Sequence, residues 1–140
     1  MGIKKLLGHN YLFAQAILYT CVITWASLAK FILPVNIRVD GSDKIAHCIA
    51  YFVFAIVWFL FLFFSEKRKE NFTQSMVKAS IFGFFYGGLM EILQMLLTTY
   101  RSSDWYDVIA NTSGIIFAVI LLKVFENKII KLSKRKSSAE

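Results

Sequence analysis

The feature that most constrains this chain is a series of four long apolar segments separated by short polar connections. The segments run from about residue 11 to 33, 45 to 64, 76 to 97 and 105 to 122. A helix of about 20 residues is long enough to cross the ~30 Å hydrocarbon layer of a bilayer. In addition, 57% of the residues are hydrophobic and only 18% are charged, which is unlike a soluble domain. The sequence therefore predicts an all-α integral membrane protein, a four-helix bundle.

The connections between the segments are too short to hold a further domain, and such short connections favour antiparallel neighbouring helices. We divide the chain into an N-terminal segment 1–10, a four-span membrane domain 11–125 and a basic tail 126–140. The sequence also leaves open that the first segment is a cleaved signal peptide, because the small residues ASLA precede Lys30.

The net charge of +7 is distributed as in a membrane protein rather than in a nucleic-acid-binding protein. Of the 16 basic residues, 12 lie before the first segment, around the second connection or after the fourth segment. Because basic residues concentrate on the cytoplasmic side, both termini are expected in the cytoplasm of a bacterial inner membrane. The tail then acts as a flank that stops transfer, or alternatively lies on anionic lipid. We expect no nucleic-acid partner.

The polar residues of the last three segments gather toward the end of each segment that this topology places outside. They are Asp43, Lys44, His47 and Tyr51, then Glu91 and Gln94, and finally Arg101, Asp104, Asp107 and Asn111. On a helix, Asp43, His47 and Tyr51 fall within ~80° of one another. Gly83 and Gly87, at a four-residue step, lie on the same face as Glu91 and allow close helix packing. The sequence predicts a polar pit, open outward, with the first segment as a supporting wall.

Most of these residues also have a structural interpretation. Asp43 and Asp104 are suited to cap helix N-termini, and Tyr51 and Trp105 are typical interfacial anchors. Lys44 and Arg101 are placed to reach the membrane interface, and Asn111 and Gln94 to form hydrogen bonds between helices. His47 and Glu91 are harder to explain by packing alone, because ionisable groups inside a membrane are costly.

The ordered series of these residues, from Asp43-Lys44-x-x-His47 through Glu91-x-x-Gln94 to Arg101-x-x-Asp104-x-x-Asp107-x-x-x-Asn111-x-x-Gly114, resembles the VanZ-like family. The resemblance covers about residues 35 to 122. It implies a small bacterial membrane protein of the cell envelope. It also implies a possible link to resistance against the glycopeptide teicoplanin.

Several functions remain open at this stage. The first is binding of a polar or lipid-linked envelope ligand, for example a cell-wall precursor, by the residues of the pit. Membrane lipids are the other expected partners. The second is an intramembrane hydrolase or transferase in which His47, Glu91 and Asp107 are the candidate catalytic residues. The third is an accessory structural subunit in a homo-oligomer or membrane complex. A transporter is less well supported, because the cytoplasmic halves of the segments are apolar. We expect no cofactor and no metal, although a metal held by His47, Glu91 and Asp107 is a variant of the enzyme hypothesis.

Overall fold

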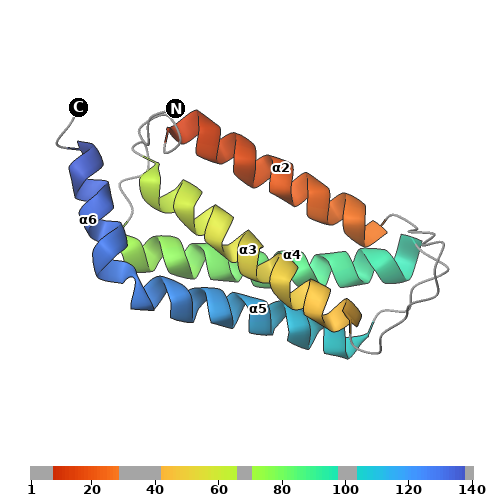
Figure 1. The fold of residues 1–140 in the computed structure, drawn as a ribbon. Coiled ribbons are helices and arrows are strands. Elements are labelled where there is room, and N and C mark those ends of the chain that lie inside the picture. The colour runs from red at the N-terminus through yellow and green to blue at the C-terminus, as the bar shows by residue number, and fades with distance from the viewer. Residues whose placement is uncertain (1–7, 29–41, 66–70, 98–103, 138–140) are drawn as a thin grey trace.

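A computed structural model describes residues 8–28, 42–65, 71–97 and 104–137, and the described residues form five helices and no strand. The helices are α2 (His9–Leu28), α3 (Ser42–Phe64), α4 (Phe72–Leu97), α5 (Trp105–Val124) and α6 (Glu126–Ser137). The first four run antiparallel to their neighbours in sequence and form one elongated bundle (Figure 1). The all-α bundle predicted from the sequence is therefore confirmed.

Four of the helices, α2 to α5, are long and apolar enough to cross a membrane. The predicted segments agree with them within a few residues, except that the end of the first segment lies outside the described residues. Large apolar side chains cover the outside of the bundle, among them Phe85, Leu96 and Ile116, which are 70%, 68% and 52% exposed. A soluble protein rarely exposes so much apolar surface. The helices therefore belong in lipid.

Helix α3 occupies the centre of the bundle, where it packs against α2, α4 and, most extensively, α5. The approach of α3 to α5 depends on Gly114. A Cβ atom at this position would lie 2.1 Å from the carbonyl oxygen of Cys48 and 2.9 Å from the amide nitrogen of Phe52. Helices in membranes associate through such close backbone contacts, because lipid gives no hydrophobic drive for apolar side chains to associate.

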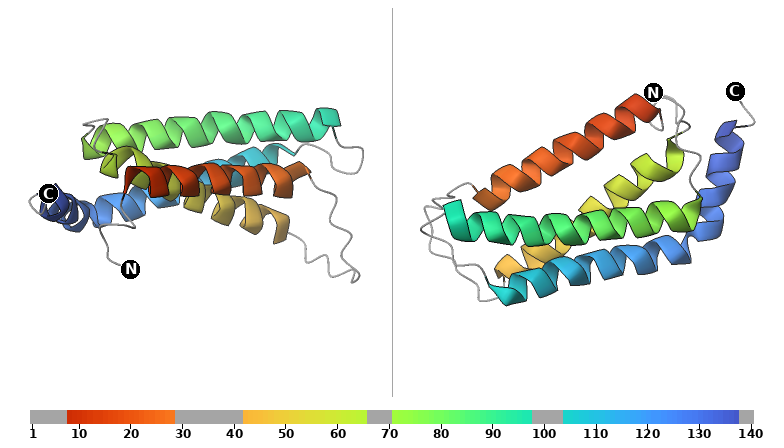
Figure 2. Two further views of the ribbon diagram at one scale, coloured as in Figure 1. Left: turned by 90° about the horizontal axis from the view of Figure 1, so that it is seen from above. Right: turned by 180° about the vertical axis from the view of Figure 1, so that it is seen from behind.

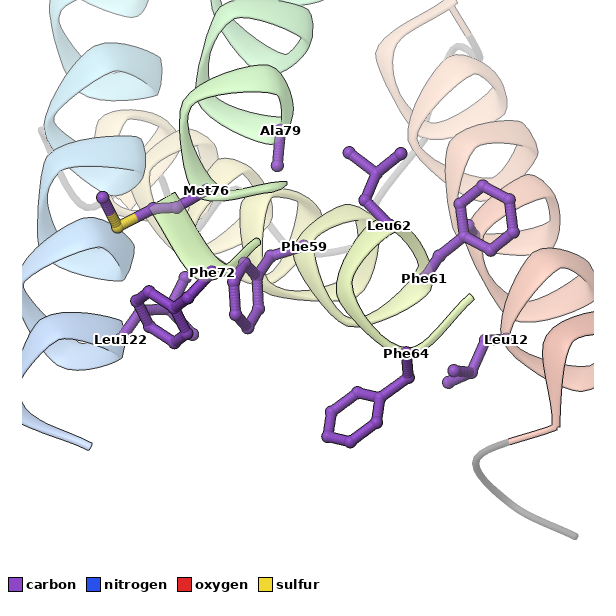
Figure 3. Packing of buried hydrophobic residues seen from close by; sticks show 10 residues of the cluster. Leu12, Phe59, Phe61, Leu62, Phe64, Phe72, Met76, Ala79 and Leu122 are labelled. Atoms are coloured by element: carbon purple, nitrogen blue, oxygen red, sulfur yellow. The ribbon is translucent and has the colours of Figure 1, made fainter. Parts of the chain in front are cut away.

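The main hydrophobic core lies at the end of the bundle where α3 ends and α4 begins (Figure 3). The aromatic ring of Phe59 is fully buried and lies 4.9 Å from the ring of Phe72, centroid to centroid. Leu12 and Ala16 of α2 and Leu122 of α5 complete this core. The polar ends of α3, α4 and α5 lie away from it, and the core therefore fixes the bundle without occupying the predicted site.

A layer of hydrogen bonds joins α2 to α3 and α4 in the middle of the bundle. The Thr20 hydroxyl accepts from the Trp58 indole at 3.2 Å. The hydroxyls of Thr24 and Tyr86 lie 2.5 Å apart. Because hydrogen bonds between helices stabilise their association in lipid, this layer holds α2 against the other three helices.

Helix α6 turns away from the axis of α5 and crosses the end of the bundle where α3 ends and α4 begins (Figures 1 and 2). Ile129 and Ile130 are partly buried against the main core, whereas Lys128, Lys131 and Lys134 are exposed. The basic tail predicted from the sequence is thus an amphipathic helix over most of its length.

Candidate functional site

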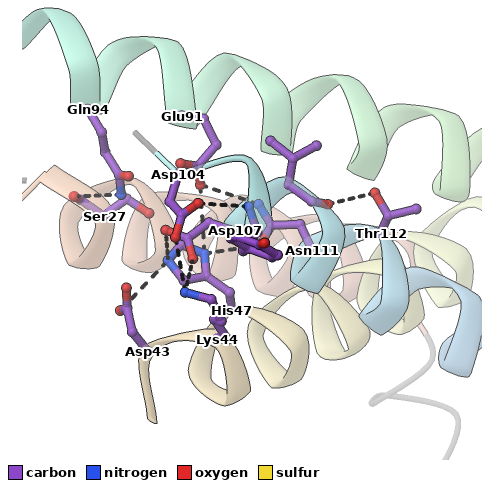
Figure 4. Close-up of polar contacts among 12 residues, drawn as sticks. Ser27, Asp43, Lys44, His47, Glu91, Gln94, Asp104, Asp107, Asn111 and Thr112 are labelled. Atoms are coloured by element: carbon purple, nitrogen blue, oxygen red, sulfur yellow. Dashed lines mark hydrogen bonds and ion pairs between the residues drawn. The ribbon is translucent and has the colours of Figure 1, made fainter. Parts of the chain in front are cut away.

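The candidate site lies where the N-terminal ends of α3 and α5 meet the C-terminal half of α4 (Figure 4). Asp104 is the N-cap of α5, and its carboxylate accepts a hydrogen bond from the backbone amide of Tyr106 at 3.0 Å. The expected capping role of Asp104 is therefore confirmed. Asp43, in contrast, lies inside the first turn of α3, which begins at Ser42, so the expectation that Asp43 is the cap was wrong.

His47 is the centre of the cluster, and it is only 8% exposed. Its Nδ1 atom lies 3.0 Å from Oδ1 of Asn111 and 3.8 Å from Oε1 of Glu91. Its Nε2 atom lies 3.9 Å from a carboxylate oxygen of Asp43 and 3.9 Å from one of Asp107. Residues from all three helices thus surround one imidazole ring.

Asn111 connects this ring to α4. Because an amide oxygen can only accept, Nδ1–H of His47 donates the hydrogen bond to Asn111 Oδ1. The amide nitrogen of Asn111 in turn donates to Glu91 Oε1 at 3.5 Å. Asn111 and Glu91 are each 3% exposed, so this chain of contacts is shielded from solvent. It is the kind of interhelical hydrogen bonding that the sequence suggested for Asn111.

Lys44 lies at the outer edge of the cluster. Its ammonium group is 3.1 Å from Oδ2 of Asp104 and 3.9 Å from Oδ1 of Asp107. The backbone hydrogen bond from Tyr106, together with the hydrogen bond from Lys44, holds the pKa of Asp104 below its ordinary value. Lys44 therefore links the start of α3 to the start of α5 rather than only extending toward the membrane interface.

The glycines of α4 allow these contacts to form. A Cβ atom at Gly87 would lie 3.1 Å from the ring of Tyr51 and 3.3 Å from the amide nitrogen of Asn111. One helical turn farther along the same face is Glu91. The predicted packing of the face that carries Gly83, Gly87 and Glu91 is therefore what brings Glu91 into the cluster.

Two predicted residues lie beside the cluster rather than in it. The Gln94 amide donates to the backbone oxygen of Ser27 at 3.1 Å and so contacts α2. Tyr51 is only 2% exposed, which shows that its interpretation as an interfacial anchor was wrong. Its hydroxyl is buried and has no hydrogen-bond partner among the described residues.

Trp105 is 83% exposed at the start of α5, as expected of an anchor. Arg101 lies outside the described residues.

An open pocket of about 120 Å³ adjoins the cluster on the side of α2. Ile23, Ala26 and Ala50 contribute apolar surface, and the polar residues of its lining are Ser27, Asp43, His47 and Tyr51. The sequence predicted the first segment as a supporting wall of the polar pit, and α2 does form one wall of this pocket through Ile23, Ala26 and Ser27. The small residues of α2 near Ser27 are the sequence feature that could have predicted the pocket beside α2. The same residues also fit a signal-peptide cleavage site.

Comparison with known proteins identifies relatives of the chain. A model of the VanZ/LLP1 family matches residues 9–126. A protein of Schizosaccharomyces pombe described as "Uncharacterized protein C11E3.10" is 32% identical over 89 residues, which are 64% of this chain and 49% of that protein. The chain thus spans about half the length of this relative. No solved structure matches the chain.

Proposed function

This chain belongs to the VanZ/LLP1 family, and from that premise we propose that it binds the polar head group of a lipid-linked ligand. The head group enters the cluster around His47 and Lys44, while the apolar part of the ligand remains in the bilayer. A site of this kind needs polar groups at the end of a membrane bundle and a way to reach them from the lipid.

The observation that carries this proposal is the mixed character of the pocket between α2 and α3. Its lining combines apolar surface from small residues such as Ala26 and Ala46 with the polar residues Ser27, Asp43, His47 and Tyr51. Its volume of about 120 Å³ suits a small group rather than a whole drug-sized ligand. An amphiphile with a compact polar head matches such a pocket in both chemistry and size.

The orientation supports a head group on the extracytoplasmic side. Among the described basic residues, Lys78, Lys123 and Lys128 lie in the first third of α4, at the end of α5 and in α6, and Lys44 lies in the cluster. The first three positions are at the end of the bundle opposite the cluster (Figure 1). By the positive-inside bias, that end faces the cytoplasm and the cluster faces outward. The membrane is then a bacterial inner membrane, and the ligand is a component of the cell envelope.

A lipid-linked cell-wall precursor fits this location and chemistry. Lys44 offers a cationic donor to a phosphate or carboxylate, and Asp43 accepts from hydroxyl or amide groups. Resistance to teicoplanin would follow if binding changed how the precursor is presented at the surface. Expression of the chain in a susceptible bacterium, with measurement of the minimal inhibitory concentration, tests that step separately from binding.

The binding experiment uses a photoreactive lipid with a phosphorylated head group and the protein in lipid nanodiscs. The Ala46→Leu variant fills the pocket, and Ala14→Leu, on an exposed face of α2, is the matched control. We expect crosslinking to the wild type and to the control, and at least a tenfold loss in Ala46→Leu. Equal labelling of all three proteins would show that the lipid does not enter this pocket.

A second candidate function is that of an intramembrane hydrolase or transferase. It is favoured by the hydrogen bond to Asn111 that orients the His47 ring. With Nδ1–H bonded to Asn111, Nε2 is directed to the side of Asp43 and Asp107, where the neutral ring can accept a proton. Mass spectrometry of envelope lipids incubated with purified protein tests this function. A product that forms with the wild type but not with His47→Gln would establish it, and unchanged lipids would exclude it for the lipids used.

A further inference from the structure

We propose that Asp43, His47 and Asp107 form a binding site for a divalent transition-metal ion, with Zn²⁺ or Mn²⁺ as the fitting species. Each residue offers one ligand atom, and the three atoms lie within 4.8 Å of one another. Asp43 and His47 are four residues apart on α3 and share one helix face, and Asp107 reaches them from the first turn of α5. This proposal goes beyond head-group binding and departs from the expectation that the chain holds no metal.

The hydrogen bond of His47 uses Nδ1 and leaves the other ring nitrogen, Nε2, available to a metal ion. The amide oxygen of Asn111 holds the proton on Nδ1, and the contact of the Asn111 amide nitrogen with Glu91 fixes which way the amide points. In the neutral ring, Nε2 is then the nitrogen that carries the lone pair. A metal-binding histidine is commonly oriented in this way, by donation of its other ring N–H to a neighbouring acceptor.

The distances around Nε2 are those of groups that share an ion rather than a hydrogen bond. The oxygens of Asp43 and Asp107 lie 3.9 Å from Nε2, which is too long for a hydrogen bond. Because all three ligand atoms lie within 4.8 Å of one another, small side-chain shifts would bring each of them to the ~2.0–2.2 Å at which a metal ion binds. When Nε2 carries no proton, its lone pair faces two carboxylates, which is repulsive, and a divalent ion turns this repulsion into attraction.

Asp107 supplies an independent reason for a cation at this place. It is only 5% exposed, and its buried Oδ1 atom accepts no hydrogen bond within the described part of the chain. The ammonium of Lys44 lies 3.9 Å from this oxygen and closer, at 3.1 Å, to Asp104. A buried carboxylate so weakly satisfied is costly. A metal ion on the other oxygen, Oδ2, which faces His47, would offset this cost.

The ligand set narrows the choice of ion. One imidazole nitrogen and two carboxylate oxygens suit Zn²⁺ and Mn²⁺, whereas Mg²⁺ and Ca²⁺ prefer oxygen ligands alone. Asp43 is half exposed, with 50% of its side-chain surface accessible, and gives the ion a route from solvent. Because Asp43 and His47 also line the pocket, an ion held by them keeps coordination positions open toward it.

The test is a calorimetric titration of metal-stripped protein in nanodiscs with ZnCl₂. We expect one ion per chain, and at least a hundredfold weaker binding in both His47→Gln and Asp107→Asn. Asn111→Leu, which removes the partner of Nδ1 and the contact with Glu91 but no proposed metal ligand, should weaken binding about 10- to 100-fold. The matched controls are His9→Gln and Glu126→Gln, at the opposite end of the bundle, and both should bind as the wild type does.

A second measurement on the wild type avoids the question of whether a variant folds. Pulsed electron paramagnetic resonance of bound Mn²⁺ detects a directly coordinated imidazole nitrogen. Its presence supports the site, and its absence would overturn it, as would zinc binding that is the same in the wild type and in Asp107→Asn. Neither readout uses the photoreactive lipid of the head-group experiment, so failure of head-group binding and failure of metal binding are distinguishable.

Discussion

Replacement of Gly114 by alanine tests the arrangement on which the whole site depends, the close approach of α3 and α5. The added Cβ atom would lie 2.1 Å from the Cys48 carbonyl oxygen, whereas ordinary contact begins at 3.4 Å. The two backbones must therefore separate by about 1.3 Å, the difference of these distances. Rigid backbone cannot yield as a flexible side chain can, so we expect a cost at or above the ~1–3 kcal/mol typical of overpacking.

The same displacement should damage the site. Cys48 directly follows His47, and Asn111 lies one turn before Gly114, so separation of the backbones lengthens the 3.0 Å contact between these two side chains. A shift of this size takes the contact beyond hydrogen-bond distance. Gly114→Ala should consequently lose metal and head-group binding together, while the other helices remain formed.

The assay is unfolding of the purified protein by SDS in mixed micelles, followed by circular dichroism. Gly88→Ala is the matched control, because a Cβ at Gly88 meets nothing within 4 Å. Removing this helix glycine should leave stability unchanged or raise it by up to ~1 kcal/mol. The reasoning would be refuted if Gly114→Ala were as stable as the wild type, or if both variants were destabilised equally.

Three further predictions concern the polar cluster and the core. Because the pKa of Asp104 is lowered in the folded protein, its contribution to stability is present above the ordinary carboxyl pKa of ~3.9 and is lost as pH falls through the folded value. Asp104→Asn should remove that part of the acid sensitivity in unfolding curves between pH 6 and pH 3. Asn111→Leu leaves the buried Nδ1–H of His47 without its acceptor and should cost about 1–3 kcal/mol in the same SDS assay. Phe59→Ala, at a fully buried ring, should cost about 3 kcal/mol, whereas Phe85→Ala, at a ring 70% exposed on the outside, should cost little; a reversed order would contradict the assignment of the core.

The sequence predicted the helices well because membrane insertion imposes a strong local rule. Within lipid, every backbone polar group must be satisfied inside its own segment, so a long apolar run can only be a helix. The three polar stripes were also predictable, since the helical period alone places Asp43 and His47 on one face. The burial of the Tyr51 side chain was not predictable in this way. A tyrosine two turns from the helix start suits both the membrane interface and the protein core. Only its packing against Gly87 shows that the side chain belongs to the core.

What the sequence determined by itself is therefore the set of spans and the identity of the ionisable residues that enter them. The tertiary structure decided which of these residues meet. It placed Asp43 and Asp107 around Nε2 of His47, paired Gln94 with Ser27, and set which residues of α2 and α3 line the pocket. The physical reason is that hydropathy and helical period act along one segment. Distances between side chains on different helices depend instead on how closely the backbones approach, and here glycines at single positions set that approach.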